Sequence, residues 1–427
     1  MQYIPQIAFL LVLAVATYFF VKSVATIRRN ILLGSNYTPN STPSFRLGNM
    51  MRVAMGQSKM VVRPVAGFFH ILIYVGFILI NIEVLEIILD GIFGQHRLFS
   101  QPLGSLYNIA IGFFEILAFL VILACVVFLF RRDVIKLKRL NTLELKGWPK
   151  VDGRNILLIE LFLMLALLVM NASDRAFQSQ SSMPISSFIA PLFDNISVSS
   201  LHVLERTAWW VHIVGILLFL NYIPYSKHLH IFLAFPNTYF AKQQPKGKFS
   251  NIEAVTTEVN LMMDPAATPP ENYEPPSSFG VKDIIDLSWK NLLDAYSCTE
   301  CGRCSSVCPA NITGKMLSPR KIMMDTRDRA DELGKHIDSK PENMHDGKSL
   351  HDKISKEELW ACTTCNACVE ACPIEINPLD IIMQMRQYLV MEEASAPTEI
   401  NNMLTNLENN GAPWQFSAMD RAKWASE

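Results

Sequence analysis

Dinucleotide- and flavin-binding signatures are missing from this sequence, because no G-x-G-x-x-G run follows a strand-like segment. No nucleophile and base stand in a catalytic pattern either. Charge is scarce: Asp, Glu, Lys and Arg make up 18% of the 427 residues, and the net charge of −1 gives no sign of a nucleic-acid partner. Eight of the nine cysteines lie in two short runs. The ninth, Cys125, lies in an apolar stretch, where we expect it to pack as a small hydrophobe. These absences argue against nucleotide-dependent and nucleophilic enzymes.

The two cysteine runs share one spacing, C-x2-C-x2-C-x3-C-P, and cover residues 298–309 and 362–373. In ferredoxins this spacing places three thiolates of a run on one [4Fe–4S] cluster and the fourth on the other cluster. Paired CxxC also suits tetrahedral zinc, but this longer pattern with proline, present twice, is rarely a zinc pattern. We therefore predict two [4Fe–4S] clusters, one on Cys298, Cys301, Cys304 and Cys372 and the other on Cys362, Cys365, Cys368 and Cys308.

Apolar residues make up 50% of the chain and its mean hydropathy is positive, which is unusual for a wholly soluble protein. Five apolar stretches approach the ~20 residues that a transmembrane helix needs. They run approximately over Ile4–Ile27, Pro64–Leu89, Leu106–Phe130, Asn155–Ala172 and Glu205–Tyr225. The first lacks a basic leading segment and a small-residue cleavage site, so we interpret it as a retained span rather than a signal peptide.

Basic residues are concentrated in two of the loops between these spans. The first loop carries Arg28, Arg29, Arg46, Arg52, Lys59 and Arg63, and the third carries Arg131, Arg132, Lys136, Lys138, Arg139, Lys146, Lys150 and Arg154. The second and fourth loops have only Arg97 and Arg175. Because positive loops stay on the cytoplasmic side, we predict a multi-pass protein of the cytoplasmic (inner) membrane with its N-terminus outside and everything after the fifth span in the cytoplasm. The reducing cytoplasm also suits unpaired cysteines.

The composition changes after residue 240. Segment 241–280 is a proline-rich linker built around Asp264–Ser278. Strand signals are weak, and helices are expected over Val281–Tyr296, Ser318–Asp331 and Leu379–Glu393. We therefore predict a mainly α protein: a five-helix membrane domain over 1–240, the linker, an α-helical ferredoxin domain over 281–395 and a partner-docking tail over 396–427.

Histidines at membrane depth are costly and usually functional. His70 lies about two turns into the second span, His212 lies in the outer half of the fifth, and His228 and His230 close the fifth on the cytoplasmic side. A b-type haem needs two axial imidazoles on facing helices at one depth. His70 and His230 meet this condition, with His228 as the substitute for His230. Packing with a hydrogen bond is the alternative role for each histidine.

With these histidines, the first 240 residues resemble the five-helix cytochrome b subunit of respiratory nitrate reductase and of membrane-bound heterodisulfide reductase. In that family the second and fifth helices each carry two histidines and bind two haems. The spacing from His212 to His230 fits the pair on the fifth helix, but the second helix has only His70, and Ile80 stands ten residues further on. The resemblance implies one inner haem b and leaves an outer haem without a ligand, so His212 is a candidate to contact a quinone instead.

From about Val281 onward the chain resembles the two-cluster iron–sulfur component of heterodisulfide reductase and related helical ferredoxins. It shares both cysteine runs and the stretch Leu317-Ser-Pro-Arg320. The tail, with Trp414 and Trp424, is similar to a connector that leads into a cysteine-rich CCG domain in fused relatives. The resemblance implies a separate CCG-type iron–sulfur protein that docks on these tryptophans; packing within their own domain is the alternative.

Ionisable residues in the spans suggest contacts with a quinone, whose reduction takes up two protons. Glu83 in the second span, Glu115 in the third and His212 in the fifth are the candidates on the outer side, and Glu160 is a further one on the inner side. Hydrogen bonding between helices is the alternative role.

We therefore predict a membrane-bound electron-transfer subunit of a quinone-linked oxidoreductase. Electrons would pass between a cytoplasmic partner, two [4Fe–4S] clusters, one haem b and menaquinone or ubiquinone, with membrane lipid around the spans. We expect the partner to be a CCG-type iron–sulfur protein, an electron-transferring flavoprotein or a dehydrogenase that holds the substrate-oxidising centre. The alternatives are a haem-free membrane anchor and an iron–sulfur redox sensor.

Overall fold

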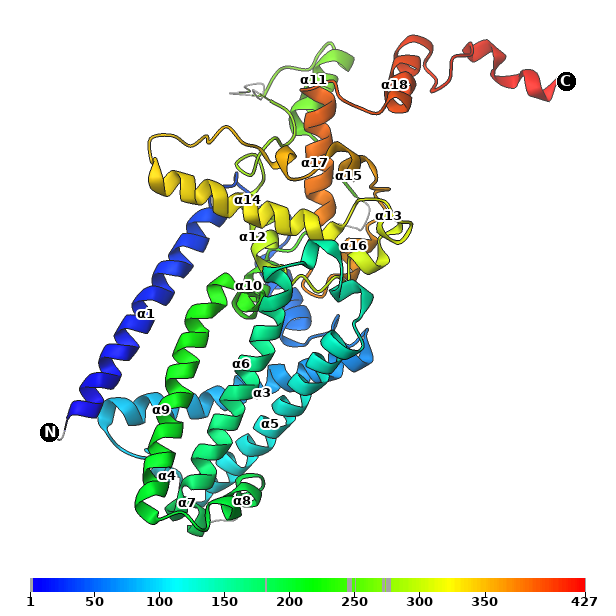
Figure 1. Ribbon diagram of the computed structural model, residues 1–427. Helices are drawn as coiled ribbons and strands as arrows, with labels where there is room; N and C mark the ends of the chain where they lie inside the picture. The colour runs from blue at the N-terminus through cyan, green and yellow to red at the C-terminus, as the bar shows by residue number, and fades with distance from the viewer. Residues whose placement is uncertain are drawn as a thin grey trace.

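The structure is a computed structural model, and it describes residues 3–180, 183–243, 248–249, 251–270, 273 and 278–426. A bundle of long helices forms the lower part of the molecule in Figure 1, and a group of shorter helices lies above it. Within the described ranges no strand forms, and the only β-type pairing is an isolated bridge between Ser35 and Ser288. The predicted mainly α fold is confirmed.

Five helices among the described residues are long and apolar enough to span a membrane. They are α1 (Ile4–Ile31), α3 (Pro64–Phe93), α5 (Ser105–Leu129), α6 (Trp148–Ser173) and α9 (Val198–Tyr222). Proline stands in the first turn of α1, α3 and α6, where its missing N–H leaves no helical bond unmade. Along the bundle α3 packs on α5, α5 on α6 and α6 on α9, while α1 lies against α3 and α9. The predicted five-helix membrane bundle is confirmed.

Aromatic packing attaches α1 to the rest of the bundle. The ring centre of Phe9 lies 5.7 Å from that of Trp209 and 6.1 Å from that of Trp210, both on α9. A Cβ on Gly91 of α3 would lie 2.6 Å from the Phe9 ring, so glycine is needed at this crossing. The connections of the bundle include the short α-helices α2 (Pro43–Met50), α4 (Ser100–Leu103), α7 (Arg175–Gln180) and α8 (Ser186–Ile189).

The fifth span ends before the last two histidines that were predicted to close it. After α9, two short 3-10 helices cover Ile223–Tyr225 and Lys227–Leu229, and α10 (His230–Tyr239) follows. Pro224 cannot donate a main-chain hydrogen bond, which favours the end of the α-helix here. His228 and His230 therefore lie on the segment after the span.

The upper part consists of short helices around one apolar core. They are α12 (Trp289–Ser297), α13 (Pro309–Ile312), α14 (Pro319–Ser339), α15 (Lys356–Trp360), α16 (Ala367–Ala371) and α17 (Pro378–Met391). Fully buried core residues include Ile284, Leu292, Ile322, Leu359 and Ile381. The helix predicted from Val281 begins later, at Trp289, because Ser288 and Asn291 form a capping box at that point.

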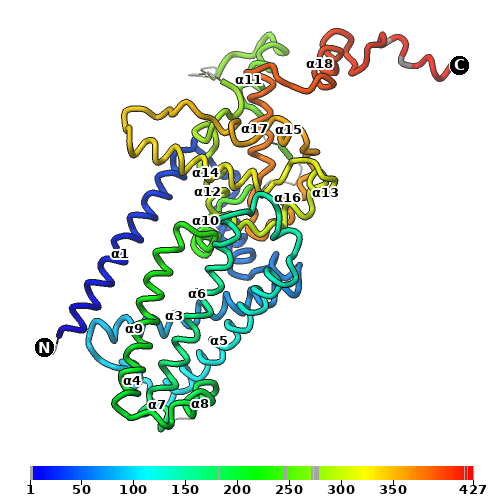
Figure 2. Tube along the Cα trace, viewed as in Figure 1, coloured from blue at the N-terminus to red at the C-terminus, as the bar shows by residue number. Residues whose placement is uncertain are grey.

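The predicted linker precedes this upper part in the sequence, and the predicted tail follows it. Helix α11 (Glu253–Met263) forms within the predicted linker, and residues 271–272 and 274–277 of its proline-rich stretch lie outside the described residues. Helix α18 (Thr398–Asn410) and the residues after it extend away from the body of the molecule, as the tube in Figure 2 shows.

The two basic loops of the membrane part both meet the upper part. Arg29, at the end of α1, pairs with Asp338 of α14, and Asn30 donates to the hydroxyl of Tyr296 (3.0 Å). Arg139, after α5, donates to the carbonyl of Cys301 (2.7 Å). The first and third loops thus lie at the same end of the bundle. The side of the membrane that this end occupies remains a prediction.

Candidate metal centres

The two cysteine runs fold into loops with the same backbone shape. Glu300 and Thr364, each two residues after the first cysteine, have φ of 53° and 58°, and Gly302 and Asn366 repeat the left-handed conformation with φ of 70° and 60°. Such turns point main-chain N–H groups into the loop. The N–H of Thr364 lies 3.4 Å from the sulfur of the first cysteine in its run, and the N–H of Glu300 bonds to the counterpart sulfur. Donors of this kind tune iron–sulfur clusters.

The folded chain gathers the eight sulfurs into two sets. One cavity is lined by Cys298, Cys301, Cys304 and Cys372, and Cys368 also contributes to its lining. In the other set, Cys362 and Cys368 interact with each other and with Cys308 and Cys365. Each set thus combines three cysteines of one run with the last cysteine of the other. The predicted crossed ligation requires this grouping; the ligation itself stays a prediction.

The chemistry of these sulfurs suits iron clusters. Burial raises the pKa of Cys298 and of Cys372 to about 12, and neighbouring thiols add to the shift, so thiolates here need a compensating cationic metal. A [4Fe–4S] cluster takes four thiolates, and each of the two sets offers four cysteines.

Side chains from the membrane part surround the first sulfur set. Besides the bond from Arg139 to Cys301, Lys59 of the first loop donates to the carbonyl of Cys372 (3.4 Å). Arg303, inside the first run, donates to the carbonyl of Lys59 (3.0 Å). The first cluster position therefore lies against the membrane part, with three cations around it.

A buried ionic cluster ties the first run to the segment that carries the histidines. Lys227 lies 2.6 Å from one carboxylate oxygen of Glu300, and Arg327 lies 2.9 Å from the other. Burial alone would raise the pKa of Glu300, but the two cations hold it below its usual value. These residues were not predicted as site residues, because Lys227 and Glu300 lie far apart in the sequence and only folding brings them together.

Arg320 fastens the third loop to the first run. Its side chain is fully buried, and its guanidinium donates to the carbonyl of Arg139 (2.6 Å), to the hydroxyl of Thr142 (2.5 Å) and to Glu144 (2.6 Å). This arginine ends the Leu317–Arg320 stretch, one of the features on which the predicted resemblance to heterodisulfide reductase rests. Its position gives that stretch a physical role at the junction of the two parts.

The second sulfur set is more open. Cys365 is exposed, and Arg386 of α17 donates to the carbonyl of Cys362 (2.5 Å) while lying 4.9 Å from the ring centre of Trp360. Trp360 also lines a surface hollow together with residues 395–397, where the tail begins. The second cluster position is therefore held from within the upper part and lies near the start of the tail.

His70 and His230 face each other beside the first run. Their ring centres are 6.3 Å apart and their planes meet at 42°. Nδ1 of His230 donates to the carbonyl of Lys227 (3.1 Å), which leaves Nε2 available, and Nδ1 of His70 is buried without a hydrogen-bond partner. Helix α10, which His230 begins, packs on α12, and α12 ends one residue before Cys298. The predicted histidine pair is thus brought together next to the first sulfur set.

His228, the substitute ligand, has a different neighbour. Its Nε2 lies 3.4 Å from a carboxylate oxygen of Glu160 on α6, and the thiol of Cys125 donates to the other oxygen (3.4 Å). The ring centre of His228 is 5.6 Å from that of His230. Glu160 is therefore close to the histidines, and Cys125 has a hydrogen bond in addition to its apolar packing.

The three outer candidates are not joined to one another by hydrogen bonds. Glu115 uses both oxygens, accepting from Asn171 (3.1 Å) and from the main-chain N–H groups of residues 185 and 186 (3.1 and 3.0 Å). His212 bonds to the carbonyl of Leu163 (2.9 Å) through Nδ1. By contrast, Nε2 of His212 and Oε2 of Glu83 are buried without partners. Glu115 is therefore bonded as in a contact between helices, whereas His212 and Glu83 each keep one buried polar atom without a hydrogen-bond partner.

The tail tryptophans do not pack into the core. Trp414 is 44% exposed and Trp424 is 80% exposed, and together with Phe416 they line a hollow on the surface. Helix α18 has no buried residue and leaves Met403 and Leu407 partly exposed on its apolar face. The tail is thus an apolar surface outside the folded body.

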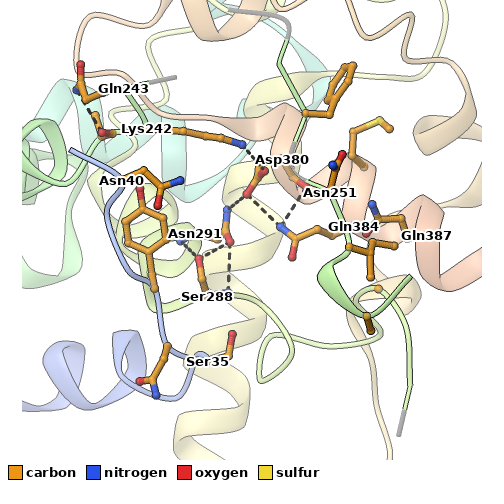
Figure 3. Close-up of a pocket in the computed structure, with 18 of the residues that line it drawn as sticks. Ser35, Asn40, Lys242, Gln243, Asn251, Ser288, Asn291, Asp380, Gln384 and Gln387 are labelled. Carbon is orange, nitrogen blue, oxygen red and sulfur yellow. Dashed lines mark hydrogen bonds and ion pairs between the residues drawn. The ribbon is translucent and has the colours of Figure 1, made fainter. Parts of the chain in front are cut away.

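A cavity of about 840 Å³ lies between the segment after α1, the segment after α10 and α17, and several polar side chains line it (Figure 3). Asp380 is its central anion: it accepts from Asn291 (3.0 Å) and Gln384 (3.0 Å) and pairs with Lys242 (3.6 Å). None of these residues was predicted as a site residue. Because its polar groups bond mostly to one another, we interpret this cavity as a joint between the two parts.

Comparison with known proteins agrees with the cysteine geometry. Residues 297–376 match the family model of the 4Fe-4S dicluster domain. The chain is 29% identical to the probable iron-sulfur-binding oxidoreductase FadF of Bacillus subtilis, over 98% of this chain and 60% of that protein. It is 28% identical to the EtfAB:quinone oxidoreductase of Syntrophomonas wolfei, over 90% of this chain and 54% of that protein. No solved structure matches.

A shorter match concerns the iron–sulfur part. Over 27% of this chain and 59% of the relative, the sequence is 33% identical to one component of the ferredoxin/F(420)H(2)-dependent CoB-CoM heterodisulfide reductase of Methanosarcina acetivorans. The predicted likeness to heterodisulfide reductase is confirmed for this part, while the likeness to the nitrate reductase cytochrome stays a prediction. This chain spans about 60% and about half of the first two relatives. Together the matches support an electron-transferring iron–sulfur protein with membrane helices.

Proposed function

We propose that this chain carries electrons between a cytoplasmic redox partner and the quinone pool through two [4Fe–4S] clusters and one haem b. The observation that carries the proposal is the His70–His230 pair beside the first sulfur set. Two imidazoles that bind one metal from opposite sides, each at about 2 Å, have ring centres about 6 Å apart. The measured separation is 6.3 Å.

The ring nitrogens of the two histidines support a bound haem, one through its hydrogen bond and the other through the lack of one. The Lys227 carbonyl fixes the orientation of the His230 ring through Nδ1, which is the usual arrangement around a metal-bound histidine. His70 keeps a buried nitrogen that no protein group satisfies. A bound haem would supply one-electron chemistry at this point, and the chain's own contribution is the spacing and orientation of the two rings.

The surroundings of the sulfur sets support an order of electron transfer. The second set lies near the exposed start of the tail, and the first lies against the membrane part and the histidines. We therefore place the partner next to the second cluster and the haem next to the first. Trp414 and Trp424 are suited as apolar anchors for a CCG-type iron–sulfur protein or a flavoprotein.

Two relatives support the ends of this path. One is named as an oxidoreductase between EtfAB and quinone, and the other as an iron-sulfur-binding oxidoreductase. By analogy we propose an electron-transferring flavoprotein as a donor and menaquinone or ubiquinone as the acceptor, or the reverse direction. Glu83 and His212, each with an unpartnered buried atom, and Glu115 are the outer candidates for the quinone's protons.

A visible spectrum of the detergent-solubilised protein, taken before and after a quinol is added, tests the haem. We expect the α-band of reduced haem b to appear with the quinol. In the His70→Ala variant this band should be lost while the broad iron–sulfur absorbance remains. His202→Ala, which changes an exposed histidine on α9, is the matched control and should keep the band.

Two outcomes would contradict the proposal in different ways. A haem band that persists unchanged in His70→Ala would remove this ligand assignment. A wild-type spectrum with cluster absorbance and no haem band would favour the haem-free membrane anchor or the redox sensor.

A further inference from the structure

A groove in the membrane part runs between α1 and α9, which lie side by side (Figure 1). Its volume is about 540 Å³. Its walls are almost wholly aliphatic and aromatic, and they include Leu11, Val15, Phe19, Leu217 and Leu218. Leu11 is 62% exposed and Leu218 is 67% exposed, so the groove opens sideways toward lipid.

One end of this groove is polar and uncharged. The hydroxyls of Ser23 and Tyr225 are 3.0 Å apart, and Ser23 also donates to the carbonyl of Phe19 (3.0 Å). The amide nitrogen of Asn221 donates to the carbonyls of Ala16 (3.1 Å) and Leu217 (2.9 Å), so its amide oxygen is the polar atom that stays open as an acceptor. Ser23 stands five residues before Arg28, or about 8 Å along the helix. These groups therefore lie below the first arginines of the loop, and Lys22, the neighbour of Ser23 on α1, is exposed at the same level.

The polar end lies at the level of the histidine pair. Tyr225 ends the 3-10 helix that precedes the segment from Lys227 to His230. On the other wall, Phe20 of α1 contacts Phe232 of α10, with ring centres 6.1 Å apart. A molecule in this end of the groove would thus lie next to the helix that His230 begins.

We propose that this groove binds an isoprenoid quinone, with the ring at the Ser23–Asn221–Tyr225 end and the tail along the aliphatic walls. The head of the reduced form, the quinol, is neutral and carries two hydroxyl groups, one of which can donate to the open amide oxygen of Asn221. The phosphate and ester oxygens of a phospholipid only accept hydrogen bonds, so they would leave that oxygen without a partner. The inference rests on the proposed function, and it names the site at which quinone enters.

Helix geometry favours this location over the outer candidates. On α3, Glu83 lies 13 residues beyond His70, which corresponds to about 20 Å along the helix. No second histidine stands on α3 to carry a haem across that distance. The groove, by contrast, reaches the depth at which His70 and His230 meet, because its polar end includes Tyr225.

Native mass spectrometry of the full chain, extracted from quinone-containing membranes, tests the groove. In the Ala16→Phe variant a phenyl ring would fill the groove from the α1 wall, and we expect loss of most of the bound quinone. Ala14→Phe adds the same ring to the same helix at an exposed position that does not line the groove, and it should keep the quinone. Unchanged cluster absorbance in both variants checks their folding.

A second variant covers the case in which Ala16→Phe does not fold. Tyr225→Phe removes only the hydroxyl of a 68% exposed ring, and it should weaken quinone retention without changing phospholipid retention. Phospholipid or a second copy of the chain as the sole bound species would overturn the groove assignment, as would equal quinone retention in Ala16→Phe and Ala14→Phe.

Reduction of the haem by added quinol, measured beside quinone retention, separates this inference from the proposed function. A haem that quinol reduces equally well in the wild type and in Ala16→Phe would overturn the groove alone. Quinone retention that depends on Ala16 in a protein without haem would overturn the electron path and leave the groove in place.

Discussion

The first and second cysteine runs have the same spacing and the same left-handed turns, but they differ in what surrounds them. From the membrane part, Arg139 and Lys59 donate to carbonyls of the first sulfur set, and Lys227 pairs with Glu300 of the first run. The second run is held by Arg386 from its own part, and Cys365 is exposed. The comparison teaches that spacing determines which metal group can bind, whereas the surroundings determine its place in the electron path. Cluster potentials depend on such surroundings.

The largest expected effect comes from replacing the fourth cysteine of each run with serine. Cys308→Ser should damage the cluster held by the second run, and Cys372→Ser should damage the cluster held by the first run, because each fourth sulfur lies with the opposite set. Electron paramagnetic resonance of the reduced protein, with iron content, would distinguish the two clusters.

The two variants serve as controls for each other. If Cys308→Ser affected only the cluster of its own run, the crossed ligation would be wrong and the two runs would be independent sites.

The next effect concerns the two ion pairs of Glu300 in the first run. Glu300→Ala removes the carboxylate between Lys227 and Arg327. Lys227 keeps Asp152 (3.8 Å) and Arg327 keeps Asp328 (3.0 Å), so the expected cost stays below the roughly 3 to 5 kcal/mol of a buried charge left wholly without a partner. We expect the first cluster to be lost at clearly lower denaturant concentration, as followed by cluster absorbance. Thr364→Ala, at the equivalent position of the second run, changes a partly exposed side chain and should have little effect.

An equal response of Glu300→Ala and Thr364→Ala would mean that the ionic cluster does not hold the first run to the membrane part. If Thr364→Ala destabilised its cluster more than Glu300→Ala does, the second run would depend more strongly on this position than the first.

Short-range patterns account for the parts of the structure that the sequence predicted. The gathering of the first three cysteines of each run follows from two-residue spacings, and the five spans follow from apolar length, so both depend on local information. The crossing of the fourth cysteine was predicted from the known ferredoxin pattern and not from local information. The histidine pair was predicted from depth alone, but its placement after the span depends on Pro224 and on two 3-10 helices. Likewise, Ser288 and Asn291 were a visible capping signal that would have moved the start of α12 to Trp289.

The contacts between the two parts could not be predicted in this way. Arg139 meets Cys301, and Lys227 meets Glu300, across 162 and 73 residues of sequence. No periodicity or spacing relates such partners, because they depend on how the upper part sits on the bundle. The groove between α1 and α9 was missed for the same reason: each wall is an ordinary apolar helix, and only their arrangement creates the space.

The smallest expected effect separates Gly302 from Asn366, which occupy the same position in the two loops. Both have a left-handed backbone, which a non-glycine residue adopts at a modest cost. A Cβ on Gly302 would also lie 2.9 Å from the carbonyl oxygen of Arg139 and 2.5 Å from the guanidinium of Arg320. Gly302→Ala should therefore destabilise the first cluster by about 2 kcal/mol, from backbone strain and overpacking.

Asn366→Ala is the matched change in the second run, where a side chain is already accommodated. We expect it to cost below about 1 kcal/mol, since only the tolerance of asparagine for this backbone is lost. Denaturant titrations that follow the loss of cluster absorbance would compare the two variants. If Gly302→Ala lowered the stability of its cluster no more than Asn366→Ala does, the third loop would not pack closely against the first run. The difference between the two runs would then have to come from the ion pairs of Glu300 alone.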